Sequence, residues 1–140
     1  MFNKTKNFVL VLTAMLTVNV MAVEVSSSLL GAIEQVESRG NTTAIGDSGK
    51  AYGVYQIHES YVQDVNRISG KNFTHADAFD KDKAKEMVEI YLNHYGKSYE
   101  KKTGKKATNE VLARIHNGGP NGYKKDATKK YWNKVNKELK

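Results

Sequence analysis

The sequence predicts a small, mainly helical domain with at most one short β element. Apolar residues recur at helical spacing in five segments, which are bordered by residues that commonly cap or end helices. One glycine-rich stretch, residues 40–57, interrupts this pattern and alternates only imperfectly, so we expect any β structure there. Residues 23–140 are enough for a single domain with one modest core.

The first 22 residues are typical of a secretory signal peptide. Two lysines precede an apolar run from Phe8 to Val20, and the segment ends in Val-Met-Ala, a small-residue cleavage site. The run is short for a membrane span. We therefore expect an exported protein, periplasmic or secreted, whose domain is residues 23–140 and which keeps no stable membrane anchor after cleavage. An uncleaved N-terminal anchor is the alternative.

The first helix is expected from Leu29 to Ser38, after a serine run that offers an N-cap. Leu29, Ile33 and Val36 form its apolar stripe, and Glu37 follows on the edge of that stripe. Partial burial and the negative end of the helix dipole both disfavour a charged carboxylate. We therefore expect Glu37 to hold a proton near neutral pH, as a general acid must.

The loop that follows carries a second candidate carboxylate. Asp47 stands between Gly46 and Gly49, where a polar, adaptable backbone should leave it ionised. One protonated and one ionised carboxyl group is the pairing used for glycoside hydrolysis. The same two acids can also be read as a surface helix end and a turn former. Residues 51–57 are expected to form a short strand or a turn into the next helix.

Two further helices are expected in the middle of the chain. The first should run from Glu59 to Ile68 and stop at Gly70. The second, with the strongest apolar periodicity, should begin after an Asp80 cap. Gly96 is expected to weaken its end and to leave Glu100 to Lys106 as an exposed basic loop.

The remaining elements follow from capping residues. Thr74 and Asp77 have capping-box spacing within a connecting segment. A fourth helix should run from a Thr108 cap to Gly118, and a fifth from about Asp126 to Leu139. Trp132 is expected in the core rather than as a sugar-stacking platform.

Charge and cysteine content narrow the partners. The formal net charge is +7, and from Lys97 onward 13 Lys and Arg accompany 4 Asp and Glu. We expect this basic C-terminal half to attract anionic envelope polymers, whereas the aromatic and basic alternation of nucleic-acid modules is not evident. The chain has no cysteine, so disulfides, zinc-thiolate sites and cysteine nucleophiles are excluded. We expect no metal and no cofactor, because no ligand cluster has suitable spacing.

Two segments resemble one group of proteins. VESRGN followed by AIGDSGKAYGVYQI, within residues 36–57, resembles the Glu-Ser and Gly-x-x-Gln-Ile signature of the lysozyme-like superfamily, which includes lytic transglycosylases. ARIHNGGPNGYKKDATKKYWNKV, residues 113–135, closely resembles the C-terminal signature of invertebrate-type, destabilase-like lysozymes. The resemblance implies an α+β lysozyme-like fold. The lack of cysteine departs from the animal members and points to a bacterial or phage-type relative.

The resemblance also implies roles for individual residues. Glu37 occupies the position of the general acid, and Asp47 lies in the loop that carries the second carboxylate. That loop is shorter here; carboxyl groups about 5–5.5 Å apart would favour retention, and a wider gap inversion or a single-Glu mechanism. The implied substrate-binding residues are Gly53, Tyr55 and Gln56 on one cleft wall and His116, Asn117 and Gly118 on the other. A helix C-cap role is the alternative for His116 and Asn117. His58 replaces the lysine usual in the family.

The implied function is cleavage of the β-1,4 bond between N-acetylmuramic acid and N-acetylglucosamine in peptidoglycan glycan strands. Glu37 would protonate the leaving oxygen and Asp47 would support the oxocarbenium ion. Two alternatives remain open. The first is a lytic transglycosylase that uses Glu37 alone, and the second is a non-catalytic protein that binds the cell wall.

Overall fold

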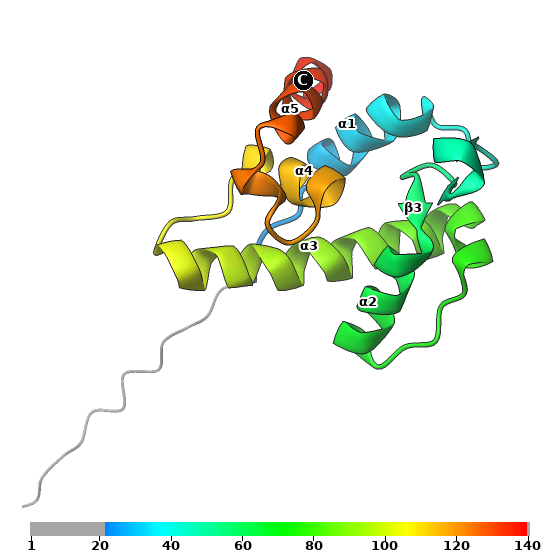
Figure 1. The fold of residues 1–140 in the computed structure, drawn as a ribbon, viewed down its shortest axis with the longest axis horizontal. Helices are drawn as coiled ribbons and strands as arrows, with labels where there is room; N and C mark the ends of the chain where they lie inside the picture. The colour runs from blue at the N-terminus through cyan, green and yellow to red at the C-terminus, as the bar shows by residue number, and fades with distance from the viewer. Residues whose placement is uncertain (1–21, 140) are drawn as a thin grey trace, which may run out of the picture.

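The computed structural model describes residues 22–139, and the predicted signal peptide lies outside them except for Ala22. The described part is mainly helical, with a small sheet near its first loop, as predicted (Figure 1). The α-helices are α1 (Ser27–Ser38), α2 (Glu59–Ser69), α3 (Lys81–Thr103), α4 (Asn109–Gly118) and α5 (Ala127–Glu138). The strands are β1 (Ile45–Gly46), β2 (Ala51–Tyr52) and β3 (Ile57–His58). Three 3₁₀ turns are η1 (Asp47–Gly49), η2 (His75–Phe79) and η3 (Gly122–Lys124). None of the described helices is long and apolar enough to cross a membrane.

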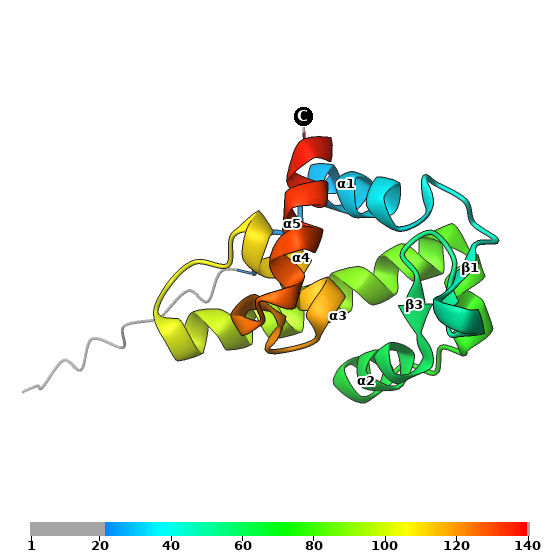
Figure 2. The same cartoon turned by 45° about the horizontal axis from the view of Figure 1, so that its top comes forward.

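The long helix α3 is the support for the rest of the molecule. The sheet, η2 and α2 lie along its N-terminal half, and α4 packs further along it (Figure 1). Helices α1 and α5 lie side by side in both views (Figures 1 and 2). The core between these elements is fully apolar at its centre, where the largest buried side chains are Leu29, Ile33, Ile57, Met87, Leu92, Leu112 and Ile115. Trp132 is partly buried at the edge of this core.

Helix α3 does not weaken at Gly96, so the predicted start of the exposed loop at Glu100 was wrong, and the loop begins at Gly104. The helix continues to Thr103 and ends at Gly104, whose φ of +69° gives a left-handed C-cap. Gly96 has a packing reason instead: a Cβ there would lie 2.9 Å from Val23 Cγ1 and 3.0 Å from a Leu112 methyl carbon. The missing side chain lets the N-terminal segment and α4 approach the helix closely.

The capping predictions are confirmed for the elements that position the site. Ser26 accepts a hydrogen bond from the backbone of Leu29 and begins α1, and Arg39 ends α1 in the left-handed conformation. Gly70 ends α2 in the same conformation. The Thr74 and Asp77 capping box is present and begins η2.

The ambiguous segment 51–57 is two strands joined by a tight turn. Strands β1, β2 and β3 form an antiparallel sheet in chain order, in which Ala51 pairs with Gly46 on one side and His58 on the other. Gly53 has a φ of +74°, and a Cβ there would lie 1.9 Å from the Ala78 carbonyl oxygen. Only glycine fits this turn beneath η2. The sheet therefore holds Asp47, which follows β1, near His58 at the end of β3.

Candidate active site

One pocket brings together both predicted carboxylates. It has a volume of about 270 Å³ and lies where the end of α1, the sheet, the start of α2 and the end of α4 meet. Its lining residues are Glu37, Asp47, Ala51, Gln56, His58, Tyr61, His116 and Asn117. Five of the predicted site residues, from three separate parts of the sequence, therefore line a single pocket.

Glu37 lies in the last turn of α1 with its side chain only 18% exposed. Its Oε1 is 3.5 Å from Nε2 of His116, which comes from α4. Tyr131 of α5 is a second neighbour: its hydroxyl is buried and has no hydrogen-bond partner among the described residues. Burial most of all, and then the negative charge of Glu37, raise the pKa of Tyr131 strongly. Glu37 is therefore enclosed by His116 and by a Tyr131 side chain that stays protonated at physiological pH.

The contacts of His116 assign its tautomer. Nε2 lies 3.2 Å from the backbone carbonyl oxygen of Tyr55, and a carbonyl oxygen only accepts, so Nε2 carries a hydrogen. Nδ1 lies 3.2 Å from the hydroxyl of Tyr61. In the neutral ring Nδ1 accepts from that hydroxyl, and the Nε2–H is left to serve both the Tyr55 carbonyl and Glu37. The His116 side chain is only 4% exposed, so this arrangement is fixed by packing.

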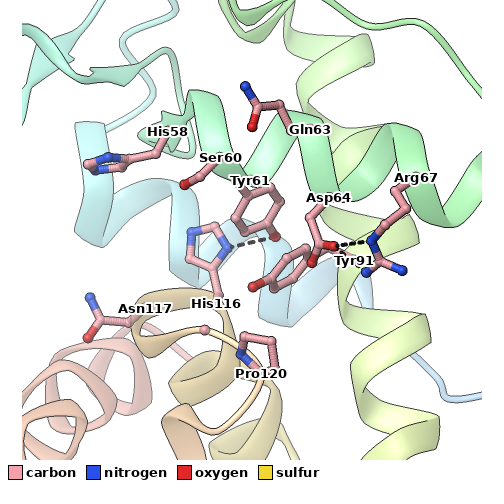
Figure 3. Close-up of a pocket in the computed structure, with 11 residues that line it drawn as sticks. His58, Ser60, Tyr61, Gln63, Asp64, Arg67, Tyr91, His116, Asn117 and Pro120 are labelled. Carbon is pink, nitrogen blue, oxygen red and sulfur yellow. Dashed lines mark hydrogen bonds and ion pairs between the residues drawn. The ribbon is translucent and has the colours of Figure 1, made fainter.

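Tyr61 completes this chain of contacts from α2. Its ring stacks on Tyr91 of α3 with centroids 3.8 Å apart. Burial, followed by the influence of Tyr91, Glu37 and Asp64, holds the pKa of Tyr61 well above its ordinary value. The phenol therefore stays protonated and can donate to His116. Figure 3 shows the contact between the Tyr61 hydroxyl and the ring nitrogen of His116.

Asp47 has the opposite surroundings. Its side chain is 61% exposed, and its Oδ2 lies 3.2 Å from Nε2 of His58. The backbone of Asp47 has a φ of +47° and that of Ser48 a φ of +54°. Two consecutive non-glycine residues in the left-handed region are uncommon and store strain, although Asp tolerates this conformation better than most residues. The loop conformation therefore directs the Asp47 carboxylate into the pocket.

Three predicted residues do not line the pocket but support it. The buried Gly53 forms the turn under η2, and the ring of Tyr55 is buried in the core, where burial raises its pKa to about 12. Tyr55 reaches the site through its carbonyl oxygen alone. A Cβ on Gly118 would lie 2.5 Å from Thr128 Cγ2, so this glycine allows close packing of α5. Gln56 does line the pocket, but its amide nitrogen already donates to the carbonyls of Ala44 and Gly53.

Sequence reasoning missed Tyr61, Tyr131 and the part played by His58. Both tyrosines stand at apolar positions of their helices, and the sequence pattern therefore predicts core residues without indicating where their hydroxyls point. His58 is the last residue of β3 and directly follows the Gln56-Ile57 pair of the motif, which was the one available signal.

The carboxylate pocket opens into a longer groove. A larger pocket of about 700 Å³ shares His58, Tyr61, His116 and Asn117 with it and runs along α2 (Figure 3). A third pocket, of about 330 Å³, shares His58 with both and extends toward Tyr52 and His75. Three pockets that share lining residues, with the two carboxylates in one of them, give room for an extended ligand.

Comparison with known proteins identifies the family of the chain. Residues 26–138 match the Destabilase family. The chain is 36% identical over 118 residues to a lysozyme of Magallana gigas, covering 81% of this chain and 80% of that one. It is 35% identical over 118 residues to invertebrate-type lysozyme 6 of Caenorhabditis elegans, covering 79% and 84%.

Solved structures give the same result for the fold. The crystal structure of Tapes japonica lysozyme superposes with a TM-score of 0.65 at 30% identity, covering 80% of this chain and 89% of that one. Inhibitor-bound lysozyme from Meretrix lusoria superposes with a TM-score of 0.65 at 33% identity, covering 80% and 88%. The chain, which contains no cysteine, therefore belongs to the destabilase, or invertebrate-type lysozyme, family.

Proposed function

We propose that this protein is an exported muramidase that hydrolyses the β-1,4 bond between N-acetylmuramic acid and N-acetylglucosamine in peptidoglycan. Membership of a family whose relatives are lysozymes supports the reaction class. The observation that carries the assignment of residues is that Glu37 and Asp47 line one pocket although they come from a helix end and a separate loop. The two further pockets, which share lining residues with that pocket, suit a glycan strand.

Glu37 is the general acid of the proposed reaction. His116 Nε2–H faces Oε1, so Oε1 acts as an acceptor and the acidic proton is left to Oε2. From Oε2 the proton passes to the glycosidic oxygen as the bond to the anomeric carbon breaks. The largely enclosed position of Glu37 excludes bulk water from this side of the transfer.

Asp47 stabilises the positive charge that develops on the sugar ring. Its exposure keeps it well solvated before substrate binds, and His58 holds its Oδ2 in place. A glycan strand in the groove would displace water from the carboxylate and strengthen its attraction to the oxocarbenium ion. Water then completes the hydrolysis and leaves a reducing end on the muramic acid.

The test is product analysis of the mature protein with purified peptidoglycan. Wild type should release reducing-end muropeptides, and Glu37→Gln should lower the rate by about 10²- to 10⁴-fold, the usual contribution of a general acid. Asp47→Asn should also lower the rate strongly. Mass spectrometry of the released fragments identifies the chemistry. A Glu37→Gln protein as active as wild type would disprove the catalytic assignment, and no release by wild type would leave the non-catalytic, wall-binding alternative.

A second candidate is a lytic transglycosylase, in which Glu37 acts as acid and then as base. The contrast between the two carboxylates supports this mechanism, because Glu37 is enclosed beside His116 while the Asp47 side chain is 61% exposed. The muramyl 6-hydroxyl replaces water in this route, so the products are anhydro sugars without reducing ends. Anhydro products that survive Asp47→Asn would establish this mechanism in place of hydrolysis.

A further inference from the structure

The larger pocket contains a charged group that the proposed hydrolysis does not use. This pocket, of about 700 Å³, continues from the carboxylate pocket along α2. Its lining includes Asp64 and Arg67 from α2 and Gly119 and Pro120 from the loop after α4. Figure 3 shows Asp64 and Arg67 at the end of the pocket away from His58.

Arg67 is held in a defined position by its neighbours. Its Nε donates to Asp64 Oδ1 over 3.0 Å, and one of its terminal nitrogens, Nη2, also contacts that oxygen. The same Nη2 lies 3.2 Å from the hydroxyl of Tyr95 on α3, which in turn donates to Asp64 Oδ2. Both carboxylate oxygens of Asp64 are thus occupied, and the guanidinium is tied to two helices. Ion pairs three residues apart on a helix surface are common, but this pair has an additional tie across to α3.

The remaining edge of the guanidinium is free to bind a ligand. Nη1 of Arg67 has no hydrogen-bond partner among residues 22–139, and the side chain is 64% exposed. An arginine whose position is already fixed loses little conformational entropy when it binds an anion. Carboxylate and phosphate groups both match its planar donors, and of these the proposed substrate carries carboxylates.

Within the carboxylate pocket and the larger pocket, the charge distribution favours a carboxylate at Arg67, whereas the third pocket has a cation of its own, Lys50. Among the described residues that line the carboxylate pocket and the larger pocket, Arg67 is the one lysine or arginine. The carboxylate pocket instead holds Glu37 and Asp47, which would repel an anionic ligand. Peptidoglycan has an uncharged glycan backbone, and its free carboxylates lie on the stem peptide attached to each muramic acid. When a glycan strand lies over Glu37, a contact between one of its stem carboxylates and Arg67 would thus fix the orientation of the strand in the pocket.

We propose that Arg67 binds a free carboxylate of the peptidoglycan stem peptide, so that the larger pocket selects peptide-bearing glycan over bare glycan. Asp64 and Tyr95 are positioning residues that hold the guanidinium for this contact. The inference rests on the proposed muramidase function. It adds a second recognition element, in which the larger pocket recognises the stem peptide on the sugar and not the sugar chain itself.

The experiment compares three forms of one peptidoglycan preparation. The first has intact stems, and the second has its stem carboxylates converted to amides. The third is stripped of its stems by an N-acetylmuramoyl-L-alanine amidase, and the lactyl carboxylates that this hydrolysis frees on muramic acid are then converted to amides as well. Cleavage at limiting substrate gives kcat/KM for wild type and Arg67→Gln on each form. Loss of one charge-assisted hydrogen bond predicts about a tenfold lower kcat/KM for Arg67→Gln on intact stems, mainly through KM. On the amidated and stripped forms the two proteins should have the same kcat/KM.

A matched control removes a nearby charge outside the pocket. Lys71→Gln breaks an exposed pair with Glu86 just beyond α2 and should leave all three rates unchanged. Arg67→Lys keeps the charge but not the planar donors, and should recover only part of the preference for intact stems. Binding to Glu37→Gln, which retains the groove, gives a readout without turnover: a disaccharide-peptide should bind more tightly than the bare disaccharide, and adding Arg67→Gln should abolish that difference.

Each result has one meaning. Equal losses for Arg67→Gln on all three forms would overturn the inference, because the residue would then act on the fold or on the sugar. Equal rates for Arg67→Gln and wild type on intact stems would also overturn it, while leaving the muramidase function intact. A wild-type protein that cleaves none of the three forms overturns the proposed function and this inference with it.

Discussion

The two carboxylates of the pocket are held in opposite ways. Glu37 is enclosed where α1, α4 and α5 meet, beside a buried histidine and a buried tyrosine. Asp47 projects from a strained surface loop and is mostly in water. The Glu37 side depends on tertiary packing between distant segments, whereas the Asp47 side depends on local backbone conformation. Changes on the first side should therefore affect the stability of the whole domain, and changes on the second should act mainly on the loop.

The largest expected difference is between the two histidines. His116→Ala leaves the Tyr61 hydroxyl and the Tyr55 carbonyl without their partner in a buried place, and should destabilise the domain by about 3 kcal/mol. His58→Ala removes an exposed pair and should cost less than about 1 kcal/mol. Urea denaturation of both variants measures the comparison. Equal losses would show that the Glu37 side is not the more tightly packed one.

The buried surroundings of Glu37 should also be the first part of the site to lose stability at alkaline pH. Burial, with smaller contributions from Glu34 and Glu89, raises the pKa of Tyr55 from 10.0 to about 12 in the folded state. The folded protein thus binds this proton more tightly than the unfolded chain does. The resulting stability is fully present below pH 10 and is lost as the pH rises toward 12.

Tyr55→Phe removes this titrating group and leaves the backbone carbonyl that His116 uses. Between neutral and strongly alkaline pH, the free energy of unfolding should fall less in the variant than in wild type, by up to about 2 kcal/mol. Denaturant titrations at a series of pH values give the difference. Parallel pH profiles for the two proteins would contradict the prediction, and Tyr52→Phe, on a partly exposed ring, is the matched control.

From the sequence one could expect Glu37 and Asp47 to lie at one site, and they do line one pocket, but their surroundings could not be predicted. Helical spacing places Glu37 at the edge of an apolar stripe, and the loop glycines identify Asp47, because both signals are local. The contact between Tyr61 and His116 joins residues 55 positions apart, and an apolar helical pattern predicts only that such a tyrosine is buried. Gly96 shows the same limit, because its close neighbours, Val23 and Leu112, are distant in the sequence.

The next effect separates activity from stability on the Glu37 side. Tyr131→Phe deletes a buried hydroxyl that has no hydrogen-bond partner among the described residues, so folding stability should stay the same or rise slightly. The hydroxyl lies near enough to Glu37 for the two to influence each other, and removing this polar group from beside the carboxyl should lower kcat by about tenfold and shift the pH profile of kcat. Unchanged kcat and pH profile would show that Tyr131 only fills space.

The smallest expected effect comes from replacing a glycine by alanine in each of the two elements that carry the carboxylates, helix α1 for Glu37 and the loop for Asp47. Gly31 lies exposed in α1, and a Cβ there would meet nothing within 4 Å. Gly49 also has open space around it, but its φ is +89°. Gly31→Ala should raise the free energy of unfolding by about 0.5–1 kcal/mol, because alanine favours the helix. Gly49→Ala should lower it by about 1 kcal/mol, because an L side chain strains the left-handed backbone.

The same two variants should also differ in catalytic activity. Gly31→Ala stiffens a helix whose end already holds Glu37 in place, so kcat should not change. Gly49→Ala forces the backbone two residues after Asp47 to move toward negative φ, which rotates the loop and draws the carboxylate away from the pocket it now lines. Thermal denaturation and initial cleavage rates measured on the same samples test both halves. If Gly49→Ala kept full activity, the position of Asp47 would not depend on its local backbone, and the contrast between the two carboxylates would reduce to exposure alone.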